Sequence, residues 1–213
     1  MQINTKKKTK LQSSIISKEW IIEQAFTILK EKGRVTFTSN NILDVFQTSA
    51  ISIEHHFDSI NQLEKEVIKK ALNLLLEYQS KRLTQCAALD SGIGYVAFSV
   101  DEHNLFQAII SEKHSDLFKA YGGRHFQMML MGCLSDPTLK DIPPDKICNF
   151  LISLTIYFHG MAILRSFFSP EQIETMNREV TKMVLKLKSD YLEQCQDKAM
   201  SGDDKNNNFV GLQ

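Results

Sequence analysis

The stretch Ser17–Gly33, SKEWIIEQAFTILKEKG, has the pattern of one complete helix. Ser17 stands where a helix N-cap is expected, and Gly33 follows as a left-handed cap that ends the helix. The apolar residues between them recur every three or four positions, which is the spacing of one face of an α-helix. They are Ile21, Ile22, Ala25, Phe26 and Leu29. The stretch therefore predicts a helix with one buried face.

A helix-turn-helix pattern comes next. Thr38 is expected to cap a short helix that carries Ile42, and Ser49 a second short helix with Phe57 facing inward. The polar residues Gln47 to Ser49 suit a tight turn between them. In a helix-turn-helix the first short helix braces the second, whose exposed residues meet base edges in the major groove. An ordinary three-helix packing unit has the same pattern, so both interpretations stay open.

The rest of the chain continues with helical patterns. Ser59 and Gln62 have the spacing of a capping box, which predicts the start of a long helix. More apolar segments follow beyond a break expected at Asp90-Ser91-Gly92, and a final helix is capped by Ser169. No stretch alternates with period two for long enough to be a strand, so the predicted fold class is all-α. The apolar stripe that the long helix is expected to bury consists of Leu63, Val67, Ala71, Leu74 and Tyr78. The later helical segments are expected at Tyr95–Ser111, His114–Tyr121, Gly123–Leu134, 145–168 and 170–194.

The composition narrows the class of protein. With 25 basic and 25 acidic residues among 213, the formal net charge is zero, and 43% of the residues are hydrophobic. That hydrophobic fraction excludes global disorder. Zero net charge argues against nonspecific coating of nucleic acid or acidic membranes, which requires a surplus of Lys and Arg. A local basic patch stays compatible with it.

The four cysteines are too widely spread for a metal site or a disulfide framework. Reduced thiols, and an N-terminus without the apolar core of a signal peptide, together predict a cytoplasmic protein. No metal or cofactor is expected. The apolar stretch Ile147–Phe168 is interrupted by polar groups such as Asn149 and Arg165. A buried or interface helix is therefore favoured over a membrane span, which stays the minor alternative.

From Ile21 to Leu63 the sequence resembles the N-terminal domain of the TetR family of bacterial transcriptional regulators. The resemblance rests on a helix core pair and its terminal glycine, on threonines that enter the second helix, and on an aromatic-Phe-x-Ser signature before a long linker helix. In this chain these residues are Ala25, Phe26, Gly33, Thr36, Thr38, Ile42, Ser49, His56-Phe57, Ser59 and Leu63. Two later segments are similar to parts of a TetR ligand domain: Tyr95–Phe98 with Asn104–Phe106, and HGMAIL at His159–Leu164.

The resemblance implies a homodimeric regulator, usually a repressor, that binds an operator and is released by a small apolar or aromatic ligand. Its parts would be a flexible basic arm (1–16), a helix-turn-helix DNA-binding domain (17–62), a ligand-binding and dimerisation domain (63–196) and a disordered tail (197–213). The two operator half-sites would mirror the twofold axis of the dimer. Residues expected to face DNA are hydrogen-bonding side chains without a fixed charge: Thr38, Ser39, Asn40, Thr48, Ser49, Ser52, His55 and His56.

The chain departs from the family pattern where DNA is touched. Ile51, Glu54 and Ile60 stand where the family commonly has a small residue, a phosphate-binding tyrosine and a backbone-contacting lysine. From Leu11 to Ser80, nine acidic residues oppose seven basic ones, although phosphate neutralisation supplies most nonspecific affinity for DNA. Two interpretations remain. Either the head binds an operator with help from the Lys6–Lys10 arm and from dimerisation, as its hydrophobic skeleton favours, or it has become a protein-interaction module.

The second half supplies candidates for a ligand pocket and a dimer interface. An aromatic and methionine lining suits a flexible or planar apolar ligand, although core packing explains each such residue singly. The ligand candidates are Phe98, Phe106, Phe118, Phe126, Met128, Met129, Tyr157, His159 and Met161. The last two helices would form a four-helix interface with a second subunit through Ile152, Ile156, Gly160, Ile163, Met176, Val180 and Val184.

An enzyme finds no support in the sequence. Cys148 and His159 lie eleven residues apart on one expected helix, about 16 Å by the helical rise, which is too far for a nucleophile–base pair. Neither a phosphate-binding glycine loop nor a paired-carboxylate motif is present in the sequence. We therefore expect no catalytic residues.

Overall fold

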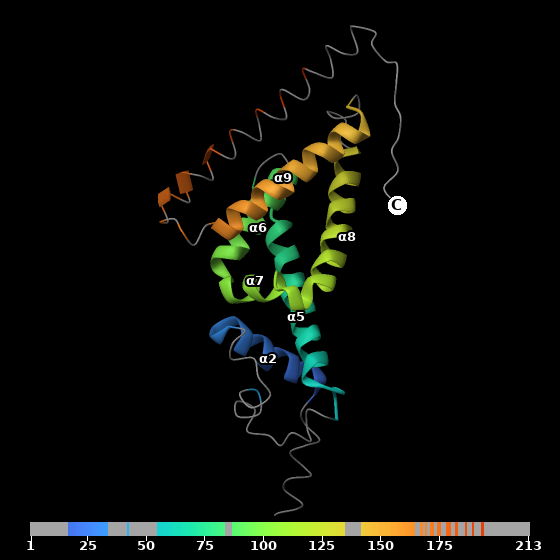
Figure 1. Cartoon of the computed structure of the whole chain (residues 1–213), viewed down its shortest axis with the longest axis vertical. Helices are drawn as coiled ribbons and strands as arrows, with labels where there is room; N and C mark the ends of the chain where they lie inside the picture. The colour runs from blue at the N-terminus through green and yellow to red at the C-terminus, as the bar shows by residue number, and fades with distance from the viewer. Residues whose placement is uncertain are drawn as a thin grey trace, which may run out of the picture. The chain divides into compact units, whose positions relative to one another are not determined.

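The computed structural model describes residues 17–33, 42, 55–83, 87–134 and 142–164, together with scattered positions between 167 and 193. The regular secondary structure of these residues is helical, without a strand, which confirms the all-α fold class. Figure 1 follows the helices in chain order. They are α2 (Lys18–Lys32), α5 (Ile60–Gln79), α6 (Ala87–Asp101), α7 (His103–Ile109), the 3₁₀ turn η2 (Glu112–His114), α8 (Ser115–Leu134) and α9 (Pro144–Leu164).

The chain divides into two compact units. The first comprises residues 1–81 and 94–124, and the second comprises residues 82–93 and 125–213. Helices α6 and α8 each run from one unit into the other, because a division falls inside each of them. The division into a head at 17–62 and a body at 63–196 stays a prediction.

Helix α2 begins and ends where the sequence predicts. The Ser17 side chain accepts a hydrogen bond from the Trp20 backbone N–H at 3.1 Å, which satisfies a donor that the helix itself leaves unpaired. Gly33 has a φ of 75°, a conformation that residues with a Cβ rarely adopt, and its N–H donates to the Leu29 carbonyl. The buried face consists of Ile21, Ala25, Ile28 and Leu29, while Ile22 and Phe26 are half-buried.

Helix α5 starts in a capping box. The Gln62 N–H donates to Ser59 Oγ at 3.3 Å, and Gln62 Oε1 accepts from the Asp58 N–H at 2.7 Å. The second bond goes to the residue before the cap rather than to the cap itself. The buried hydrophobic stripe is Leu63, Val67, Ile68, Ala71, Leu72 and Leu75, whereas the predicted Leu74 and Tyr78 are half-buried. The buried stripe continues from Ala71 to Leu75, four residues on, whereas the predicted stripe continued to Leu74, three residues on.

Helices α2, α5 and α7 pack against one another in the first unit (Figure 1). Polar contacts fix α2 to its neighbours. Lys70 of α5 forms an ion pair with Glu23, and Lys30 forms one with Glu102 at 2.6 Å. The Asn104 side-chain amide donates to the Lys30 carbonyl at 2.8 Å. The end of α2 is therefore held against the start of α7.

Two boundaries between expected segments lie inside continuous helices. Asp90-Ser91-Gly92 lies inside α6, and its first two residues are buried. A Cβ at Gly92 would collide with the ring of Phe158, so this glycine permits close packing and does not end the helix. Gly122-Gly123 lies inside α8, which is one continuous helix. The expected segment Tyr95–Ser111 is instead divided between α6 and α7.

Helix α9 lies in the second unit. It begins at Pro144, which suits a first helical position because the missing N–H has no intrahelical partner there. Its described part ends at Leu164, and the predicted end at Phe168 lies outside the described residues. The buried face consists of Ile147, Leu151, Leu154, Phe158, Met161 and Ala162. Within the described ranges α9 is the one helix long and apolar enough to cross a membrane, and 33% of its apolar window is buried.

Beyond α9 the structure describes separate residues. Ser169 and Gln172 form a reciprocal capping box, with the Gln172 N–H donating to Ser169 Oγ at 3.3 Å and the Ser169 N–H donating to Gln172 Oε1 at 2.8 Å. This confirms Ser169 as an N-cap. The described positions from Glu171 to Glu193 are helical and exposed. The predicted interface residues Met176, Val180 and Val184 lie outside the described residues.

Candidate functional site

The expected DNA-reading segment lies mostly outside the described residues. This applies to Thr38, Ser39, Asn40, Thr48, Ser49 and Ser52, whose roles stay predictions. Two apolar residues of the segment are described. Ile42, the expected anchor of the second helix, is fully buried, and Phe57, which follows the expected recognition helix, is also buried.

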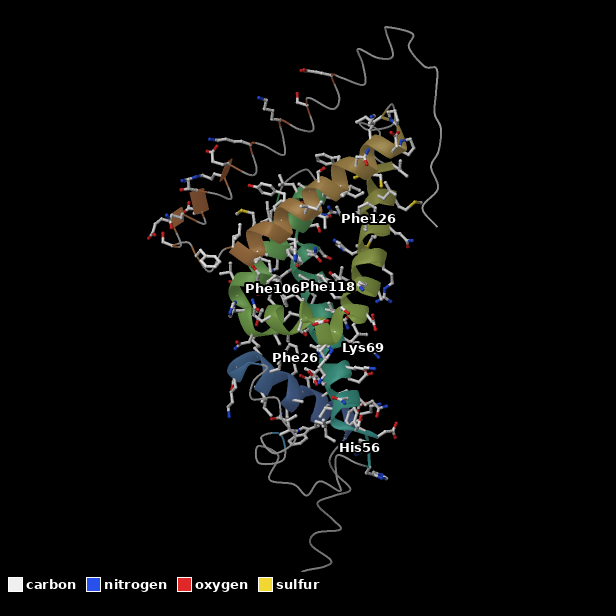
Figure 2. The ribbon with its side chains drawn as sticks, viewed as in Figure 1. Phe26, His56, Lys69, Phe106, Phe118 and Phe126 are labelled. Atoms are coloured by element: carbon white, nitrogen blue, oxygen red, sulfur yellow. The ribbon has the colours of Figure 1, made fainter. Side chains whose placement is uncertain are left out.

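His55 and His56 lie in a turn just before α5 (Figure 2). His55 is exposed and His56 is half-buried, and the two rings meet edge to face with centroids 5.1 Å apart. Lys18, at the start of α2, lies over the buried Phe57 ring at 5.2 Å from its centroid. The turn therefore joins the starts of α2 and α5, and it leaves the His55 side chain accessible to a ligand such as a DNA phosphate.

Several lysines between Leu11 and Ser80 form ion pairs with carboxylates of the same chain. Lys30, Lys69 and Lys70 form ion pairs with Glu102, Glu66 and Glu23 respectively. They belong to the seven basic residues that already face nine acidic ones between Leu11 and Ser80. A cation that is paired with a carboxylate contributes less to phosphate binding than one facing solvent alone. Lys18, Lys32 and Lys65 of α2 and α5 are exposed, while Lys6–Lys10 and Arg34 lie outside the described residues.

Glu64 forms a buried ion cluster with Lys113 and His114. Its Oε1 lies 2.8 Å from His114 Nε2, and its Oε2 accepts a hydrogen bond from Lys113 Nζ, which also donates to Asn61 at 3.1 Å. Glu64 is 5% exposed and His114 is 3% exposed. Burial by itself would raise the pKa of the Glu64 carboxyl, but the hydrogen bonds from Lys113 and His114 outweigh it and hold that pKa below its usual value.

The ion cluster joins α5 to η2, and the sequence analysis missed it. Its members are 49 and 50 residues apart, so no local spacing connects them. The available signal was Glu64 itself, an acidic residue directly after Leu63 on the stripe expected to be buried. A buried carboxylate requires a compensating partner. That requirement predicts a distant cation without identifying it.

In the second unit, Ser91 Oγ lies 2.7 Å from His125 Nε2 and links α6 to α8. Burial lowers the pKa of His125, so the imidazole is neutral at pH 7. A serine and a neutral histidine also form the nucleophile–base pair of many hydrolases. Ser91, however, is buried in the interior of a helix, where a substrate has no access. We assign the pair to helix packing.

The predicted ligand residues divide between the two units. Phe98, Phe106 and Phe118 belong to the first, and Phe106 and Phe118 are labelled in Figure 2. Phe98 and Phe106 are fully buried, each edge-on to a tyrosine, with ring centroids 5.5 Å from Tyr78 and 5.6 Å from Tyr95. Such edge-to-face pairs are typical of aromatic cores. Phe118 is half-buried on α8.

The remaining ligand candidates lie on α8 and α9 in the second unit. Met161 is buried, whereas Met128 is exposed to solvent. Burial lowers the pKa of His159, which favours the neutral form of its imidazole. Phe126, Met129 and Tyr157 are half-buried, and Phe126 is labelled on α8 in Figure 2.

Helix α9 has a second apolar face, opposite the one buried in its own unit. Ile152, Ile156 and Ile163 are exposed on it, and Ile156 is 68% exposed. Gly160 lies on the same face, and no described atom comes within 4 Å of a Cβ placed there. Spacings of four, four and three residues place all four positions on one side of a helix. We call these residues the outer α9 face. An exposed apolar stripe of this kind marks an interaction surface.

No group of three or more His, Cys, Asp or Glu side chains in the described part of the chain could hold a metal ion. Cys133 and Cys148 are both half-buried. No family model, curated protein or solved structure matches the chain. A functional assignment therefore rests on the residues described above.

Proposed function

We propose that the protein is a TetR-like transcriptional regulator of the cytoplasm, which binds an operator as a homodimer and is released by a small apolar or aromatic ligand. Repression, the usual mode of that family, is the mode we propose. The observation that carries the proposal is the junction before the long helix. There Phe57 is buried, Ser59 caps α5 and Leu63 is fully buried. These residues occupy positions of the aromatic-Phe-x-Ser-Lys-x-x-Leu signature, in which Ile60 stands at the position of the lysine.

The first helix gives further support. Ala25 and Gly33 are among the residues by which this stretch resembles the TetR head, and here Ala25 is buried and Gly33 ends the helix with a positive φ. The helix packs on α5, the helix that would link the head to the body. The head thus has the framework on which a recognition helix could be held.

The outer α9 face supports the homodimer. A helix with one apolar face buried in its own unit and another exposed requires a second apolar surface to cover it. A second copy of the chain presents the same face, and a twofold axis would bring the two faces together. Close approach is possible at Gly160. The dimer also accounts for the high hydropathy of α9, for which a membrane span is the competing explanation.

An electrophoretic shift on DNA that flanks the protein's own gene tests operator binding. The wild-type dimer is expected to retain this DNA over unrelated DNA, more strongly at low salt than at physiological salt. The double variant Thr48→Ala/His55→Ala is expected to lose the specific shift. Thr27→Ala is the matched control, because Thr27 is exposed on α2 and bonds its own helix through Glu23. Absence of any shift at low salt with purified dimer would overturn the proposal.

A protein-interaction module is the second candidate, and a specific observation favours it. The stretch from Leu11 to Ser80 carries more acidic than basic residues, and three of its lysines form ion pairs. If the protein is an interaction module, the intact dimer should shift no DNA in the electrophoretic experiment at any salt concentration. The electrophoretic experiment therefore separates the two functions.

A further inference from the structure

Glycines mark the points where the two compact units divide. In α6 the division falls after Ile93, within Gly92-Ile93-Gly94. In α8 it falls after Arg124, next to Gly122-Gly123. Both helices that run from one unit into the other thus carry two glycines at the division.

The glycines of α6 are required by packing. A Cβ at Gly92 would collide with the Phe158 ring, and a Cβ at Gly94 would collide with the backbone carbonyl of Tyr78. Glycine is the residue that permits such a close approach. These two positions are therefore explained within their own units, Gly92 in the second and Gly94 in the first.

The glycines of α8 have no such explanation. Gly122 and Gly123 are exposed, and no described atom lies within 4 Å of a Cβ placed at either position. Glycine weakens a helix interior relative to alanine, because it loses more conformational freedom on folding. Two adjacent glycines make this the intrinsically weakest turn of the 20-residue helix.

The residues on either side of the glycine pair are held in different units. Tyr121 is buried, and its hydroxyl donates a hydrogen bond to Gln79 Oε1 in the first unit. His125 is bonded to Ser91 in the second unit. The weak turn thus lies between an anchor in one unit and an anchor in the other.

We propose that Gly122-Gly123 is a hinge in α8, at which the second unit bends relative to the first. Hinges are a few positions that absorb a change of φ and ψ while the elements around them move as rigid bodies. Glycine has the widest range of such angles. The hinge does not depend on the proposed function, since it follows from the anchors and the glycines whatever the protein binds.

Distance measurement between two spin labels tests the hinge in the full-length chain. In a background with the four cysteines replaced by serine, Lys69→Cys on α5 (Figure 2) and Asn149→Cys on α9 place one exposed label in each unit. Dilution with unlabelled chain keeps each measured pair within one molecule. With both glycines present, a broad distance distribution is expected. Gly122→Ala/Gly123→Ala is expected to narrow it at least two-fold, because alanine stiffens the helix.

Gly132→Ala is the matched control. Gly132 is also exposed on α8 with open space around it, but it lies inside the second unit. Both variants should slow amide hydrogen exchange of the substituted turn, by about five-fold per alanine, which shows that alanine has stiffened it. The distance distribution should change in the double variant alone. Equal widths in the double variant and the unsubstituted background, or equal narrowing by Gly132→Ala, would overturn the hinge.

Discussion

At the scale of single residues, the ion cluster of Glu64, Lys113 and His114 is expected to contribute to the stability of the first unit. Glu64→Gln removes the carboxylate charge that pairs with Lys113, and one of the two oxygens that contact Lys113 and His114 becomes an amide nitrogen. It is expected to lower the free energy of unfolding by about 3 kcal/mol, because Lys113 loses its counter-charge in a partly buried contact. The partly exposed Lys113 keeps the loss at the lower end for buried pairs. Urea denaturation followed by circular dichroism measures it.

Glu66→Gln is the matched control for that variant. Glu66 pairs with Lys69 at 2.7 Å on the surface of the same helix. A surface ion pair of this kind contributes less than about 1 kcal/mol. Equal losses in the two variants would contradict a special contribution from the buried cluster.

The pH dependence of stability follows from the lowered pKa of Glu64. Because the folded pKa lies below the unfolded one, the ionised carboxyl contributes its full stabilisation above the unfolded pKa, about 4.3. That contribution is lost as the pH falls through the folded pKa. The difference in unfolding free energy between wild type and Glu64→Gln should therefore be constant well above the unfolded pKa and shrink as the pH falls below it. Urea denaturation at several pH values measures this difference, and a constant value would contradict the assignment.

Local residue roles were predictable, and distant partners were not. The caps at Ser17, Ser59 and Ser169 and the positive φ of Gly33 follow from side chains within three or four residues of one another. The contacts of Glu64 and His125 join positions 34 or more residues apart. Such pairs depend on how helices pack, which the local pattern does not encode.

At the scale of elements, hydrophobic periodicity predicted helices in the right regions but placed segment boundaries at glycines that lie inside continuous helices. Asp90-Ser91-Gly92 was expected to be a break and is buried inside α6. The effect of a glycine depends on what packs against it, and the ring over Gly92 belongs to α9. Local propensity cannot predict that contact, because Phe158 is distant from Gly92 in the sequence.

Gly94→Ala tests the close packing of α6 on the end of α5. The added Cβ would collide with the Tyr78 carbonyl, and backbone yields less readily than a side chain. The expected loss is about 1–3 kcal/mol of unfolding free energy, as for other overpacked sites. Thermal unfolding measures it. Gly132→Ala should instead be neutral or stabilising by up to about 1 kcal/mol, and a stabilising Gly94→Ala would contradict the packing.

At the scale of the whole molecule, the sequence predicted the fold class, while its functional predictions concern partners that a single chain does not contain. The outer α9 face was anticipated in part, since Ile152, Ile156 and Ile163 were assigned to an interface and are exposed. In the proposed dimer, the surface that covers them belongs to a second copy of the chain. Operator and ligand specificity are likewise properties of a complex.

Ile156→Glu tests the proposed dimer. A charge at the most exposed isoleucine of the outer α9 face would have to be buried without a partner, which is costly at an interface. Light scattering at micromolar concentration should therefore give a mass near the 24.4 kDa of one chain, against about twice that value for wild type. Thr155→Glu, exposed on the same helix, should stay dimeric. A monomeric wild type would contradict the interface.

DNase footprinting of the wild-type dimer on DNA flanking its own gene tests the central claim most directly. The account predicts one protected site made of two symmetric half-sites, with centres separated by one helical turn of DNA or a multiple of it, about 10 base pairs each. Protection should weaken as salt is raised. Uniform cleavage along the whole fragment, at low salt and at concentrations where light scattering detects the dimer, would contradict it.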